Sequence, residues 1–168
     1  PFIFSVVFLK SFLQFPGEPA EYIANFFMQI FYKPVSGIIA FSLISGLQFI
    51  LAMLLLKSIS KSIFTPLLAL IPLMFSMVLA NNYNLPYSIE ISVILILAFL
   101  LLMAKSGAGI FRLMLFFISA ALLIYYISGS GYSLMFSLTV ALFPFNLNHK
   151  QRTVFIAFLA GFALILPY

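Results

Sequence analysis

Long runs of apolar residues separated by short polar or glycine-containing breaks dominate the pattern of this chain. A helix that spans a bilayer needs about 20 apolar residues, and several runs approach that length. They are unbroken, whereas membrane barrel strands alternate apolar and polar positions. In lipid, backbone N–H and C=O groups must form hydrogen bonds within their own segment, which favours helices. The runs are Pro1–Phe15, Val35–Leu56, Ile63–Ala80, Pro86–Ala104, Ile110–Ile127, Tyr132–Phe145 and Thr153–Leu166.

The pattern therefore predicts an all-α fold, a polytopic transmembrane bundle with about six or seven membrane helices. We assign residues 1–168 to a single transmembrane domain. The chain begins at Pro1 and ends at Tyr168, both inside apolar stretches. We therefore expect a segment of a longer protein, with a soluble domain following it as a partner.

One segment between the first two runs has a different pattern, with a polar residue at every fourth position: Glu21, Asn25, Gln29 and Lys33. On a helix these residues form one polar stripe. Tyr22, Phe26, Phe27 and Phe31, together with Ile23 and Ile30, fall on the other face. This predicts an amphipathic helix lying in the membrane interface. It either connects two spans only or borders a groove that a lipid-linked substrate approaches.

The composition agrees with a chain dissolved mainly in lipid. Hydrophobic residues make up 65% and charged residues 7%, and the mean hydropathy is +1.25. Soluble domains are about 45–50% apolar and about 25% charged. We therefore expect the lipid bilayer to be the main partner of the chain.

The basic residues are distributed unevenly among the predicted loops. Six of the eight lie on alternate loops: Lys57, Lys61, Lys105, Arg112, Lys150 and Arg152. Basic loops face the cytoplasm. This predicts that loops 57–62, 105–109 and 146–152 are cytoplasmic, and that loops 15–34, 81–86 and 129–131 are external. The expected location is a bacterial inner membrane, crossed several times.

All three acidic residues, Glu18, Glu21 and Glu90, then fall on the external side. Each has a simple structural explanation, because carboxylates near a helix N-terminus are stabilised by the helix dipole. Glu18 and Glu21 are also candidate catalytic residues, acting as a general base or through a divalent cation. Glu90 is a further candidate, because an ionisable residue at membrane depth usually faces protein or a wet cavity.

Other chemistry has little support in the sequence. The chain has no cysteine and one histidine, His149, in a polar loop, so we predict no metal site and no cofactor. Phosphate-binding glycine loops, HExxH and Gly-x-Ser-x-Gly are absent. The basic residues are scattered over helix ends, which does not support nucleic-acid binding.

The stretch from Phe15 to Ile39 resembles the start of an uncharacterised family of multi-pass membrane proteins from Bacteroidetes-type bacteria, a domain of unknown function. Gln29, Phe31, Tyr32, Pro34 and Gly37 match its pattern, and the Asn81–Asn84 loop is similarly placed. Glu18-Pro19 departs from it, where a second glycine is expected. The resemblance implies a membrane part followed by a soluble helical region, with no assigned function.

A second resemblance is architectural, to multi-pass glycosyltransferases that use lipid-phosphate sugars. These enzymes carry acidic residues in the first external loop, where this chain has Glu18 and Glu21, but their aspartate pair is missing here.

Three hypotheses stay open at this point. The chain is a membrane module of a larger protein, a lipid-linked-sugar transferase acting through Glu18 and Glu21, or a transporter marked by Glu90 and the mid-helix Pro72.

Overall fold

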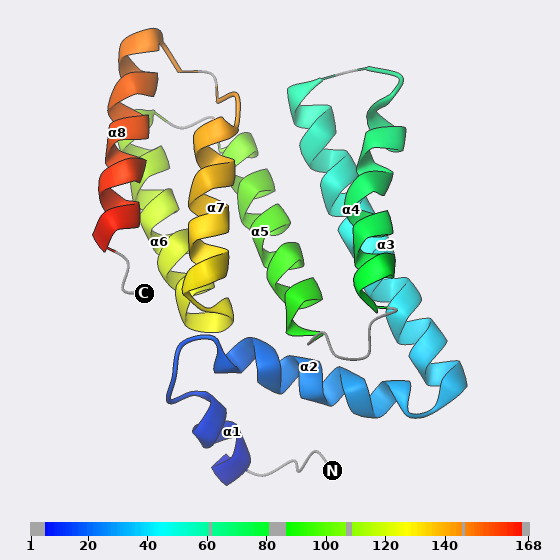
Figure 1. Ribbon diagram of the computed structural model, residues 1–168. Coiled ribbons are helices and arrows are strands. Elements are labelled where there is room, and N and C mark those ends of the chain that lie inside the picture. Colours follow the sequence, from blue (N-terminus) through cyan, green and yellow to red (C-terminus); the bar gives the residue numbers. More distant parts are fainter. Residues whose placement is uncertain (1–5, 61, 81–86, 107–108, 146, 166–168) are drawn as a thin grey trace.

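The computed structural model describes residues 6–60, 62–80, 87–106, 109–145 and 147–165, and these residues form helices without any strand (Figure 1). The predicted all-α class is confirmed. The described helices are α1 (Val6–Phe12), α2 (Glu18–Phe31), α3 (Pro34–Ile59), α4 (Thr65–Ala80), α5 (Ser88–Lys105), α6 (Ile110–Ser128), α7 (Ser130–Leu142) and α8 (His149–Ile165).

Helices α3 to α8 run up and down beside one another, and α2 lies across one end of this bundle (Figure 1). Helix α5 is central, because it contacts α2, α3, α6 and α7. The main core lies among α5, α6, α7 and α8 around Phe117, whose ring stacks on Phe136 with centroids 5.7 Å apart. Three further phenylalanine rings meet Phe117 edge-on: Phe155, Phe158 and Phe162.

Helix α2 is the predicted interfacial helix, with bounds that its sequence explains. It begins after Gly17, with Pro19 in its first turn, where a missing backbone donor costs little. It ends before Pro34, which starts α3. The four residues of the polar stripe are all exposed, whereas Tyr22, Phe26, Phe27 and Phe31 are half-buried. Ile30 is half-buried as well, but Ile23 is 38% exposed, so the predicted division into two faces is confirmed except at Ile23.

The bundle exposes many large apolar side chains and buries several polar ones beside its apolar core. Helix α4 exposes large apolar side chains such as Leu67, Ile71 and Phe75, while Ser76 on the same helix is buried. In a bilayer, lipid covers apolar side chains and small or polar residues mediate helix contacts. Buried polar residues recur through the interior: Ser45, Gln48, Thr65, Ser76, Ser88, Glu90, Ser92, Ser128, Ser133 and Ser137.

Three described helices, α3, α5 and α6, are long and apolar enough to cross a membrane. Helices α4 and α7 are apolar but shorter. Helix α7 ends at Leu142, before the predicted end of its run at Phe145, because Phe143 is extended ahead of Pro144. The sequence predicted six or seven membrane crossings. Among the described residues, three helices meet both the length and the apolarity that a crossing requires.

The ends of the helices agree with the predicted loop alternation. The last turn of α3 with Lys57, the last turn of α5 with Lys105, and the start of α8 with Lys150 lie at one end of the bundle (Figure 1). Helix α2 and the α6–α7 turn lie at the other end. Lys61 and loop 81–86 lie outside the described residues. The basic ends of α3, α5 and α8 therefore lie on one side of the bundle, whereas Lys10 in the last turn of α1 lies with α2 at the other end.

Two glycines fasten the start of α2 to the α6–α7 turn. Gly17 (φ 94°) and Gly129 (φ 95°) both adopt left-handed backbone angles, which favour glycine. A Cβ atom on Gly17 would meet Gly129 Cα at 3.4 Å. The Gly17 amide donates to the Tyr126 carbonyl at 2.9 Å, and the Tyr126 hydroxyl donates to the Leu13 carbonyl at 2.8 Å. This junction fixes one end of α2 against the bundle.

Candidate functional site

The three acids that the sequence singles out lie in different surroundings. Glu18 and Glu21 are in the first turn of α2, Glu18 half-buried and Glu21 exposed. Glu90 is in the first turn of α5 and only 5% exposed. The predicted first-turn positions are confirmed for all three. Among the described residues, no group of three or more His, Cys, Asp and Glu side chains could hold a metal ion.

Glu90 belongs to a buried polar cluster, which we define as Gln48 on α3, Ser76 on α4 and Glu90 on α5. The Ser76 hydroxyl donates to Gln48 Oε1 at 2.8 Å and has the Glu90 carboxyl as its other polar neighbour. Gln48 is 1% exposed. Glu90 Oε1 is buried and accepts no hydrogen bond from the described residues. Three helices thus place one carboxyl beside two uncharged side chains, each of which can donate or accept a hydrogen bond.

Tyr87 lies between this cluster and α2. Its ring contacts Phe31 and Phe27 of α2, with centroids 4.9 and 6.2 Å apart. The Tyr87 hydroxyl is buried and has no hydrogen-bond partner among the described residues. The aromatic end of α2 therefore covers the first turn of α5, where Glu90 lies.

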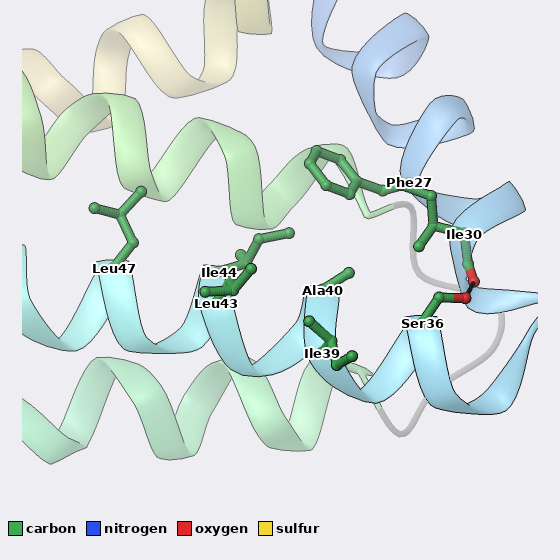
Figure 2. Close-up of a pocket in the computed structure, with 8 residues that line it drawn as sticks. All are labelled: Phe27, Ile30, Ser36, Ile39, Ala40, Leu43, Ile44 and Leu47. Atoms are coloured by element: carbon green, nitrogen blue, oxygen red, sulfur yellow. Dashed lines mark hydrogen bonds between the residues drawn. The ribbon is translucent and has the colours of Figure 1, made fainter.

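A second feature is an apolar groove between α2 and α3, with a volume of about 430 Å³. Figure 2 shows Phe27 and Ile30 of α2 at one end and a row of α3 side chains along its length. The α3 residues that line it are Ser36, Ile39, Ala40, Leu43, Ile44 and Leu47. The Ser36 hydroxyl makes hydrogen bonds to the carbonyls of Ile30 and Lys33, so even this polar group is engaged in the α2–α3 corner.

The groove lies away from Glu18 and Glu21. These two residues start α2, and the groove begins at Phe27, nine residues after Glu18, which is about 14 Å along a helix. Neither acid lines the groove. The structure therefore brings α2 to a groove, as one interpretation of its sequence predicted, but at the end opposite the two candidate catalytic carboxylates.

The match to a family model extends over residues 2–168, which is nearly the whole chain. The chain belongs to the DUF6057 family, a family of unknown function. The prediction that the chain belongs to an uncharacterised family is therefore confirmed. No curated protein and no solved structure matches this DUF6057 chain.

Sequence reasoning missed Gln48 and Ser76 in this DUF6057 chain. Each is an isolated polar residue inside a long apolar run, and that isolation was an available signal. The sequence did not predict whether these two side chains point into the bundle, because a helix that is apolar all round does not indicate which of its faces is buried.

Proposed function

We propose that the chain is a multi-pass module of a bacterial inner membrane, in which α3 to α8 cross the bilayer and the α2–α3 groove binds a phospholipid acyl chain. The observation that carries this proposal is the groove itself, because its lining is apolar and three of its α3 side chains, Ile39, Leu43 and Leu47, are exposed. Leu43 in its middle is 69% exposed. A volume of 430 Å³ is within the range of about 300–1,000 Å³ of ligand pockets.

Charge at the end of the groove supports a phospholipid as the occupant. Lys33 is exposed at the corner where α2 ends and α3 begins, and it is next to the turn that Ser36 fastens. An interfacial helix places this corner at headgroup depth. A lysine there can bind a lipid phosphate while the acyl chain follows α3 past Ala40, Ile44 and Leu47. The groove thus pairs an apolar length with a cationic end.

The transferase hypothesis needs Glu18 or Glu21 beside the bound lipid, and the groove ends at Phe27 without either. The groove therefore supports lipid binding and adds no catalytic group. The transferase hypothesis stays a prediction.

Quenching by brominated lipids tests the groove, because the chain has no tryptophan of its own. In the Leu43→Trp variant, bromine on the acyl chain is expected to quench fluorescence at a lower mole fraction than in Leu138→Trp. Leu138 is on α7 and equally exposed, so it reports ordinary lipid contact. Adding Lys33→Gln to the Leu43→Trp variant should remove its preference for anionic brominated lipid. Identical quenching curves at the two positions would show only ordinary bilayer contact and would refute a groove site.

Single cysteines test the proposed topology, because the chain has none. Gly131→Cys is at an exposed site with open space around its Cβ, and Ser58→Cys is exposed at the other end of the bundle. In spheroplasts, a membrane-impermeant maleimide is expected to label the first variant at least tenfold faster than the second. Permeabilisation should equalise the rates. Faster labelling of Ser58→Cys would reverse the proposed orientation.

A further inference from the structure

The buried polar cluster has a different chemistry from the groove. Its three side chains come from α3, α4 and α5, and all three are buried. An ionisable side chain within membrane helices almost always faces the protein interior or a water-filled cavity, and such groups mark ion and proton pathways. Here Glu90 Oε1 has no partner among the described residues, although Ser76 lies beside the carboxyl and Gln48 is hydrogen-bonded to Ser76.

The hydrogen-bond direction in the cluster depends on where its protons are. Ser76 has one proton and donates it to Gln48 Oε1 at 2.8 Å. With that proton used, the Ser76 oxygen can only accept from the Glu90 side, and a carboxyl donates only when it is protonated. The described arrangement therefore suits a chain of donors from Glu90 O–H to Ser76 Oγ–H to Gln48 Oε1.

The same three side chains also suit the ionised carboxylate. If the Gln48 amide turns over, its NH₂ group donates to Ser76 Oγ, and the Ser76 hydroxyl is free to donate to the Glu90 carboxylate. Both protonation states of Glu90 are then hydrogen-bonded without any backbone movement. Ser76→Val or Gln48→Met would remove both hydrogen-bond arrangements. Serine at position 76 and glutamine at position 48 therefore share one chemical role in the cluster.

We propose that Gln48, Ser76 and Glu90 form a reversible proton-binding site in the end of the bundle that α2 covers. Uptake adds one proton to the Glu90 carboxylate and reverses the two hydrogen bonds, and release restores them. This goes beyond lipid binding in the groove, since no groove residue belongs to the cluster.

The other groups around the site are few. Next to α5, the nearest titratable group along the chain is Tyr87, which directly precedes the helix and has a buried hydroxyl. From α2, Phe27 and Phe31 face Tyr87 and are uncharged. From α4, Ser76 faces the carboxyl, and Gln48 of α3 is hydrogen-bonded to Ser76. The described buried residues of α6 and α7 include no acidic or basic side chain. Glu90 is thus the one acidic side chain among the described groups of this cluster.

The chain has only three acidic side chains, which makes the test sharp. The Glu18→Gln/Glu21→Gln variant keeps Glu90 as its only acidic side chain. In liposomes, an apolar carbodiimide is expected to modify Glu90 by adding to the protonated carboxyl to give an N-acylurea. Peptide mass spectrometry reads the modified fraction, which should fall reversibly as the pH of the medium rises. Glu90→Gln should abolish the modification, and helical circular dichroism should confirm that this variant folds.

Two further variants separate a proton site from a merely buried acid. Ser76→Ala and Gln48→Met, which change size little, are expected to shift the midpoint of the labelling curve by at least half a pH unit. Thr139→Ala is the control, because its hydroxyl bonds only its own helix at the Met135 carbonyl. Absent labelling, or labelling unaffected by pH or by both cluster variants, would overturn the proposal. Protection by sodium ions at constant pH would also overturn it in favour of a cation site.

Discussion

Replacing Phe117 with alanine is expected to lower the free energy of unfolding in detergent or lipid by about 2–3 kcal/mol. The side chain is fully buried and contacts four phenylalanine rings, one stacked and three edge-on. Phe→Ala in soluble cores costs about 3–5 kcal/mol. Part of that cost is transfer from water, which is small when the unfolded helix stays in lipid. The remaining loss comes from the cavity and the missing ring contacts.

Phe111 supplies the matched control for this prediction. It lies on the same helix, α6, and is 76% exposed, so its ring has little packing to lose. Phe111→Ala is expected to change stability by less than about 0.5 kcal/mol. Equilibrium unfolding by a denaturing detergent, followed by circular dichroism, compares the two variants. Equal effects at the two positions would mean that α6, α7 and α8 do not pack around Phe117 as described.

The sequence predicted α2 well because its polar residues recur with a helical period. Glu21, Asn25, Gln29 and Lys33 form an exposed stripe, and proline and glycine mark both ends of the helix. The end of α7 was predicted wrongly, at Phe145 instead of Leu142. Pro144 carried the missing signal, because the residue before a proline avoids the helical conformation.

For the long apolar helices, the sequence did not predict which face turns toward the core, because their apolar residues show no clear helical period. When a helix is apolar all round, the core-facing side and the lipid-facing side have similar compositions. Only isolated polar residues distinguish them, and a single serine at position 76 does not predict that it reaches Gln48, 28 residues away in the sequence. The groove could be anticipated from the amphipathic α2, but the sequence did not show that it borders only the last turns of this helix, away from Glu18.

The two features of the site share α3. Ala40, Ile44 and Leu47 line the groove, and Ser45 and Gln48 lie on the adjacent buried face of the same helix. Helix α2 also contacts both features. Its Phe27 lines the groove and packs against Tyr87, three residues before Glu90 in the sequence. A lipid that displaces Phe27 would therefore alter the cover over the polar cluster. The attachment of α2 at its other end, the junction of Gly17 and Gly129, holds this arrangement in place.

Replacing Gly129 with alanine is expected to destabilise the protein by about 1–3 kcal/mol, because its backbone (φ 95°, ψ 174°) lies in a region that is essentially restricted to glycine. The substitution should also loosen the start of α2, since Gly129 Cα is the surface on which Gly17 rests. Gly131→Ala is the control. Gly131 is two residues along the chain, has no positive φ and has open space around its Cβ, so a change below about 0.5 kcal/mol is expected.

Hydrogen exchange distinguishes local loosening from general destabilisation. In Gly129→Ala, the amide of Gly17 should exchange much faster, because its hydrogen bond to the Tyr126 carbonyl requires the close approach of the two glycines. Amides in the middle of α6, near Phe117, should exchange faster only by the factor that the measured loss of stability predicts. Tyr126→Phe, which removes the hydroxyl bond to Leu13, should give a smaller change in the same direction. Unchanged exchange at Gly17 in both variants would show that α2 is held by its aromatic contacts with Tyr87 and α3 alone.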